Sequence, residues 1–213
     1  MIRTNSAQRQ TRTAVGAVGV LIAAAALTAC GGPARQGAAA VLGGQRITIA
    51  TVEAKVSALR DEVDAQGSGP RTERAGLTNR ALADLVLSRV VDRALSDRQL
   101  DISRTEISQA RDADAKLLGG ESELQRELLL KQGVSTGDTD AFYRQQLGIQ
   151  KLAAAEGKDA RTAEGDAVVR KALAAAGTEL KVVVNPRYGT WDPQQVSLVD
   201  TSPDWLPQRA TSS

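Results

Sequence analysis

Residues 38–48, with the sequence AAAVLGGQRIT, decide how this chain folds. Residues 38–42 predict a short strand, and residues 45–48 predict a return strand. Gly43 and Gly44 between them predict a two-residue turn, because glycine accepts the positive φ angles that tight hairpins need. The stretch therefore predicts a β-hairpin at the start of the folded part. An irregular entry segment is the alternative interpretation.

Helix signals follow the hairpin. Thr48 is placed to cap a helix through residue 66, in which apolar residues recur at spacings of three and four. Ser103 and Glu106 form a capping-box pattern, which predicts a helix from Arg104 to residue 118. Further helices are predicted over residues 77–97, 121–132, 139–155 and 162–176. The apolar residues of 77–97 spread over more than half of the circumference, which is typical of the central helix in a bundle.

The end of the chain changes character after the sixth predicted helix. Gly177 is expected to close that helix in the left-handed conformation. Residues 179–184 then become β-branched and predict a strand. Its nearest unpaired partner is the opening hairpin, so the two chain ends are expected to meet in one sheet. The predicted fold is mainly α, a bundle of about six helices closed by a small β-sheet from the N-terminal hairpin and the C-terminal strand.

Composition excludes several classes of function. The 213 residues include no His, one Cys and one Met, so histidine-based catalysis and an intramolecular disulfide are impossible. No metal site and no cofactor is expected from this residue set. Residues 1–29 hold three of the 27 Lys and Arg residues and none of the 25 Asp and Glu residues, so the chain from residue 30 has 24 basic and 25 acidic side chains. The basic whole-chain pI therefore gives no argument for a nucleic-acid partner.

Residues 1–29 have the features of a secretory signal peptide. Three arginines and no acidic residue precede an uncharged, mostly apolar run over 14–29, which is too short to cross a bilayer as a permanent helix. The signal closes on four residues, Leu27, Thr28, Ala29 and Cys30.

This tetrapeptide resembles the lipobox of bacterial lipoproteins, in which the Cys thiol receives a diacylglycerol and the chain is cut in front of it. The resemblance implies lipidation of Cys30 and anchoring on the extracytoplasmic face of the cell membrane. A plain secretory signal with an incidental free thiol is the alternative. Residues 30–37, rich in Gly and polar side chains, are predicted to be a flexible tether.

The two ends of the predicted domain carry a family resemblance. The matching residues are Ala39, Ala40, Val41, Leu42, Gly44, Ile47 and Thr48 at the start, and Val182, Val184 and residues 185–189 at the end. In this arrangement residues 38–191 resemble the N-terminal domain of SurA-type periplasmic chaperones, a family that includes PrsA-like lipoproteins, and in particular the actinobacterial SurA-N-like lipoproteins. Such proteins typically carry histidine-containing parvulin isomerase domains. The resemblance here implies the chaperone module alone, with residues 192–213 as a C-terminal extension.

The resemblance implies a non-catalytic chaperone or holdase for unfolded or exported polypeptides. A cell-envelope scaffold that binds one defined partner is the alternative, and an enzyme is the least favoured class. The candidate client surface starts from three successive leucines, which a helix packed on one side cannot all bury, joined by two aromatic residues. Its members are Leu128, Leu129, Leu130, Phe142 and Tyr143.

Two other patterns are expected to be structural. The acidic pairs at 61–62, 112 and 114, and 121 and 123 are interpreted as solvated helix faces and not as a catalytic dyad or metal site. The sequence Asn-Pro-Arg-Tyr-Gly at 185–189 predicts a turn that ends strand pairing, with Arg187 as an anion contact the alternative.

Overall fold

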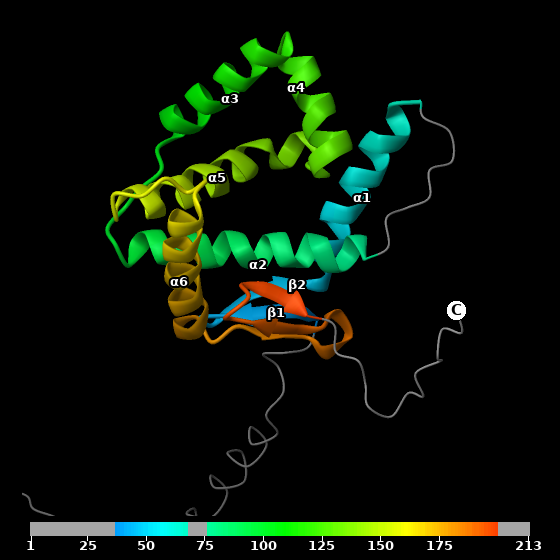
Figure 1. Cartoon of the computed structure of the whole chain (residues 1–213). Helices are drawn as coiled ribbons and strands as arrows, with labels where there is room; N and C mark the ends of the chain where they lie inside the picture. Colours follow the sequence, from blue (N-terminus) through cyan, green and yellow to red (C-terminus); the bar gives the residue numbers. More distant parts are fainter. Residues whose placement is uncertain (1–36, 68–75, 200–213) are drawn as a thin grey trace, which may run out of the picture. The chain divides into compact units, whose positions relative to one another are not determined.

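A computed structural model describes residues 37–67 and 76–199 of the chain (Figure 1). The predicted signal peptide 1–29, the lipobox with Cys30, nearly all of the tether and residues 200–213 lie outside the described residues. The described part is mainly α, as predicted. Its elements are β1 Ala38–Leu42, β2 Gln45–Thr48, α1 Ile49–Ala65, α2 Leu77–Ser96, α3 Arg104–Leu118, α4 Glu121–Glu127, η1 Leu128–Gln132, η2 Thr136–Asp138, α5 Thr139–Ala154, α6 Ala163–Glu179, β3 Val183–Val184, η3 Pro186–Tyr188, β4 Thr190–Asp192 and β5 Ser197–Val199.

Helix α2 is the central helix, as its wide apolar face predicted. It contacts α1, α5, α6 and β1, so that helices and sheet surround it (Figure 1). Its buried side chains are Ala81, Leu82, Val86, Val90, Val91, Ala94 and Leu95. The single hydrophobic core of the domain is built around this helix.

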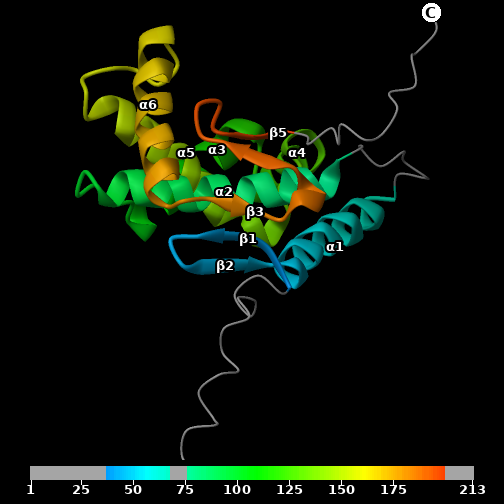
Figure 2. The same cartoon turned by 90° about the horizontal axis from the view of Figure 1, so that it is seen from below.

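The opening hairpin forms and meets the end of the chain. Gly43 and Gly44 make its turn with φ of 54° and 82°, in the left-handed region that favours glycine. Strand β1 lies between β2 and β3 in a three-stranded sheet of order β2-β1-β3, antiparallel throughout, which Figure 2 shows from below. The pairing Ala40 with Val184 confirms that the two ends of the fold close on each other.

The segment after β3 secures this closure. The backbone N–H of Asn185 donates to the carbonyl of Ala39 over 2.8 Å, and its side-chain amide donates to the carbonyl of Ala38 over 3.3 Å. The side-chain oxygen of Asn185 accepts from the N–H of Arg187 and starts the turn η3. The Arg187 guanidinium lies 5.1 Å from the ring centroid of Tyr188, which is buried. Residues 185–189 thus form a turn that is hydrogen-bonded to β1, in agreement with the turn predicted for this motif.

Gly177 does not close α6, and this prediction was wrong. Helix α6 continues to Glu179, and the left-handed conformation falls instead on Lys181, with φ of 48°. Gly177 lies inside the helix because a Cβ at this position would stand 3.1 Å from Nε1 of Trp191. The glycine therefore serves packing, and the longer helix shortens the predicted strand 179–184 to Val183–Val184.

The predicted end of the domain at residue 191 is also displaced. Strand β4 pairs with β5 through Trp191 and Leu198, so this hairpin crosses the expected boundary between domain and extension. Trp191 is buried on α6 and anchors the hairpin there. The folded part therefore includes the extension as far as Val199.

The capping box at α3 forms as the sequence predicted. The Ser103 hydroxyl accepts from the N–H of Glu106 over 3.2 Å, and the Glu106 carboxylate accepts from the N–H of Ser103 over 2.9 Å. Lys151 of α5 reaches the same carboxylate over 2.6 Å. Together the Lys151 hydrogen bond and the two from Ser103 lower the pKa of Glu106 from 4.5 to about 2.

The lowered pKa of Glu106 predicts a specific dependence of stability on pH. A carboxylate whose folded pKa is lowered stabilises the fold above its unfolded pKa of 4.5, and this contribution disappears as the pH falls through about 2. Glu106→Gln keeps an acceptor for the capping box but removes the charge. We expect the stability difference between wild type and Glu106→Gln, measured by denaturant unfolding, to shrink as the pH falls across this window.

Glu53→Gln is the matched control, because Glu53 lies on the exposed face of α1. A wild-type minus Glu106→Gln difference that stays constant down to the lowest pH would contradict the role assigned to the Glu106 charge.

Candidate functional site

The three successive leucines lie where the fourth helix changes its winding. Helix α4 stops at Glu127, and η1 continues as a π-helix closed by the N–H of Gly133 on the carbonyl of Leu128. A π-helix has more residues per turn than an α-helix, so successive side chains cover a smaller arc. This winding lets both Leu128 and Leu129 enter the core, with 4% and 5% of their surfaces exposed, while Leu130 is only partly buried.

The two aromatic residues of the predicted client surface pack against each other in α5. The rings of Phe142 and Tyr143 lie edge to face, with centroids 5.5 Å apart and an interplanar angle of 84°. The Tyr143 hydroxyl donates to Asp114 of α3 over 2.8 Å. Burial, with this hydrogen bond, raises the pKa of Tyr143 above its usual range. Tyr143 therefore fastens α5 to α3 from inside the domain.

The predicted client surface is corrected accordingly. Leu128, Leu129 and Tyr143 are buried and present no open surface, with exposures of 4%, 5% and 4%. Only Leu130 and Phe142 keep partial exposure. The structure thus does not bring the five predicted residues to one open groove.

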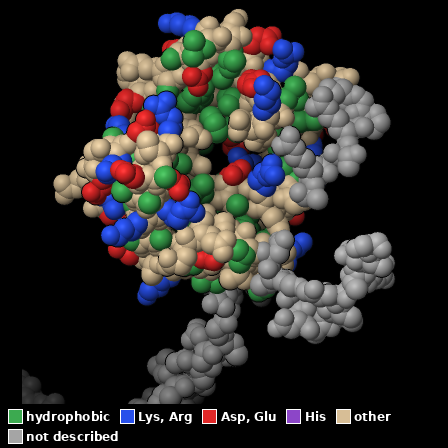
Figure 3. Space-filling view, viewed as in Figure 1, with side chains coloured by type: hydrophobic (Ala, Val, Ile, Leu, Met, Phe, Trp, Pro, Cys, Tyr) green, Lys and Arg blue, Asp and Glu red, His purple; other side chains and the backbone are tan. Residues whose placement is uncertain are grey.

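Other leucines are far more exposed, at the C-terminal end of α3. Leu117 exposes 84% of its surface and Leu118 exposes 42%. Helix α3 buries only Ile107 and Ala115, and it forms with α4 an arch over α5 (Figure 1). In the space-filling view, hydrophobic side chains reach the surface over this arch (Figure 3). The sequence signal for this site is a leucine pair directly before the Gly119-Gly120 helix stop.

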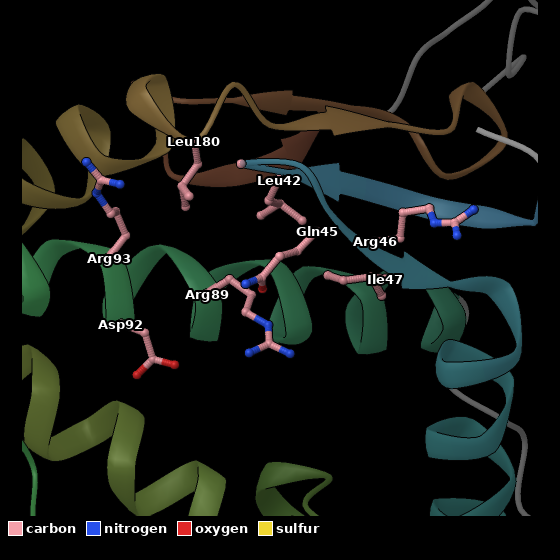
Figure 4. A pocket seen from close by; sticks show the side chains of 9 residues that line it. Leu42, Gln45, Arg46, Ile47, Arg89, Asp92, Arg93 and Leu180 are labelled. Carbon is pink, nitrogen blue, oxygen red and sulfur yellow. The ribbon is translucent and has the colours of Figure 1, made fainter. Parts of the chain in front are cut away.

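A pocket of about 340 Å³ lies between the β1–β2 hairpin and α2 (Figure 4). Its apolar walls come from the β1–β2 hairpin and from Leu180 directly after α6, and its polar residues come from β2 and α2. The lining residues are Leu42, Gly43, Gln45, Arg46, Ile47, Arg89, Asp92, Arg93 and Leu180. Sequence reasoning did not single out this pocket, because its residues come from three separate segments.

The acidic pairs form hydrogen bonds and ion pairs, and two of their members, Asp112 and Glu121, each lie 3.9 Å from Nε of Arg111. Glu62 accepts from the N–H and the hydroxyl of Thr136, and Asp61 accepts from Ser57. Glu123 pairs with Arg126 over 2.6 Å. Within 37–67 and 76–199, no group of three or more Cys, Asp or Glu side chains is placed to hold a metal ion.

A family model matches most of this chain. The model of the SurA-like N-terminal domain matches residues 1–153, which include the hairpin and nearly all of α1 to α5. The chain belongs to this family. The SurA-like N-terminal domain is a chaperone-like module of extracytoplasmic protein folding, typically non-catalytic, that binds unfolded polypeptides. Helix α6 and strands β3 to β5 lie beyond the matched residues. Searches of curated proteins and of solved structures give no match.

Within residues 37–67 and 76–199, no helix is both long and apolar enough to span a bilayer.

The burial of the three leucines predicts unequal effects of substitution. Leu128→Ser and Leu129→Ser should each lower the free energy of unfolding by about 2–5 kcal/mol, because each removes buried apolar volume and leaves a hydroxyl in the core. Leu130→Ser should lower the free energy of unfolding by less than about 1 kcal/mol, since a partly exposed side chain loses less buried apolar surface. Chemical denaturation of the three variants measures this order, and equal losses at all three positions would contradict the π-helical placement.

Proposed function

We propose that this SurA-like domain is held on the extracytoplasmic face of the cell membrane by a lipid on Cys30 and acts there as a non-catalytic holdase for exported polypeptides. The observation that carries the holdase proposal is the exposed leucine pair Leu117 and Leu118. Family membership supports the general class of partner, an unfolded polypeptide.

Leu117 and Leu118 are exposed apolar side chains that can contact the apolar residues of an unfolded segment. Single exposed leucines are ordinary on protein surfaces, but two exposed leucines at the end of one helix offer more apolar surface than one. Apolar area removed from water stabilises a complex by roughly 25 cal/mol per Å² before the costs of association. Contact of this kind is weak and independent of sequence, as a holdase requires.

The arch presents these leucines on a rigid support. The capping box fixes the start of α3, and Arg111 pairs with Asp140 of α5 over 3.2 Å. The Tyr143 hydroxyl bond to Asp114 adds a second tie between α3 and α5. Because α3 cannot turn its apolar end inward without breaking these contacts, Leu117 stays available to a client.

The sequence before residue 30 supports the anchor. A basic segment, an uncharged apolar run and Leu27-Thr28-Ala29-Cys30 occur in the order that lipoprotein signals have. Two acyl chains on Cys30 would hold the domain stably at the membrane, whereas a single chain binds only marginally.

The anchor is tested with Cys30→Ala. We expect this variant to remain as unprocessed precursor or to leave the membrane fraction, because no thiol accepts the lipid. Membrane fractionation and mass spectrometry of the N-terminal peptide measure the outcome, with wild type carrying a thioether-linked lipid. Unchanged processing and membrane retention of Cys30→Ala would refute lipidation.

The holdase activity is tested with Leu117→Ser combined with Leu118→Ser. We expect wild type to suppress aggregation of a denatured model client, and the double variant to suppress it severalfold less at an unchanged melting temperature, since neither leucine is buried. Arg104→Ser, at the exposed opposite end of α3, is the matched control. A wild-type domain that suppresses no aggregation would refute the holdase and favour the scaffold with one defined partner.

A further inference from the structure

We infer that the pocket between the β1–β2 hairpin and α2 binds a carboxylate side chain of an extended client polypeptide through Arg89. The inference rests on the proposed function and deepens it, because it names a class of client segment: apolar residues next to a glutamate or aspartate. It is independent of the leucine pair on α3, which lies on another element.

The pocket is formed before any ligand arrives. The N–H of Gly43, in the hairpin turn, donates to the carbonyl of Leu180 at the end of α6 over 2.6 Å. Leu42 and Ile47 are buried, with 3% and 6% exposure, and supply apolar walls next to Leu180. Because these side chains are already fixed, little free energy is lost in ordering the site when a segment binds. The volume of about 340 Å³ lies at the lower end of the range found for ligand sites.

Most charges in the lining are already neutralised by neighbours. Arg93 pairs with Asp97 over 2.7 Å and with Glu179 over 2.6 Å. Asp92 pairs with Arg144 of α5 over 2.9 Å. These pairs leave neither Asp92 nor Arg93 available as the principal contact for a new ion.

Arg89 differs from these residues. Among the described residues, none accepts a hydrogen bond from its guanidinium or pairs with it. In Figure 4 its side chain extends from α2, Gln45 reaches from β2 toward α2, and Arg46 extends in another direction. An unpaired guanidinium offers two parallel N–H donors, which match the two oxygens of a carboxylate. The Gln45 amide can add a further donor beside it.

The surroundings favour a peptide carboxylate over a membrane surface. A flat anionic bilayer approaching Arg89 would also meet Asp92, Asp97 and Glu179, whose ion pairs with Arg93 and Arg144 give it no further attraction. A single carboxylate on an extended chain can reach Arg89, while a neighbouring apolar side chain contacts Leu180, which is partly exposed at the pocket. Arg89, which has no partner among residues 37–67 and 76–199, and the apolar walls together therefore fit an acidic-apolar peptide segment.

Fluorescence anisotropy with two labelled peptides tests the inference. The peptides are extended, amidated at the C-terminus and identical except for a central Glu or Gln between apolar residues. The protein is the chain from residue 30 with Cys30→Ser, which keeps every described residue. We expect the Glu peptide to bind about tenfold more tightly than the Gln peptide at low salt, with the difference falling as salt rises.

Arg89→Gln should abolish this preference, and Arg104→Gln, which removes an exposed charge on α3, should retain it. Circular dichroism melting of both variants checks that the fold is kept. Equal affinity of wild type for the two peptides would overturn the carboxylate site and leave the holdase proposal standing. Failure to bind either peptide would overturn the carboxylate site, whereas the holdase proposal is decided separately by the aggregation assay on the leucine pair of α3. Binding of phosphatidylglycerol vesicles that depends on Arg89, without a preference for the Glu peptide, would overturn the inference in favour of a membrane contact.

Discussion

Helix α2 is apolar around most of its circumference, and the rest of the domain is arranged to cover it. Such a helix cannot lie at a surface without exposing several leucines and valines, so it needs neighbours over most of its circumference, and a charged face with Arg89 and Arg93 stays exposed. α1 covers its beginning, α5 and α6 cover its length, and β1 covers a further side. The burial of β1 is a consequence, since its alanines face this core, and a buried central strand requires partners on both edges. The return of the chain as β3 supplies the second partner.

Close packing in this domain depends on small side chains, because the chain has only five aromatic residues with which to fill space. Gly148 of α5 lets that helix approach α2, since a Cβ there would stand 2.6 Å from Cγ1 of Val91 and 3.2 Å from Cδ1 of Leu95. Gly177 of α6 makes room for Trp191 in the same way. Both glycines weaken the helices that contain them, and the contacts they allow compensate for this loss. The positions of α5, α6 and the β4–β5 hairpin therefore depend on the lack of a side chain at Gly148 and at Gly177.

The described surface has two features that our proposals connect with the recognition of flexible polypeptides. The exposed leucines on α3 offer nonspecific apolar contact, and Arg89 offers one charge-specific contact in a concave site. Neither place combines a nucleophile with a base, and the chain has no histidine. Such surfaces agree with the chaperone-like character of the SurA-like N-terminal domain, which binds unfolded polypeptides.

The sequence by itself determined the elements whose signals are local. The Gly43-Gly44 turn, the Thr48 cap, the box of Ser103 with Glu106 and the apolar breadth of α2 all depend on neighbours a few residues away, and the structure has each of them. The family followed from the same local patterns at the two chain ends. Tertiary structure alone decided the role of Gly177, the winding of η1, the burial of Tyr143 and the lack of a partner for Arg89 among the described residues. These features depend on which distant segment covers a side chain, and no local pattern carries that information, because burial is a property of the packed chain and not of the residue.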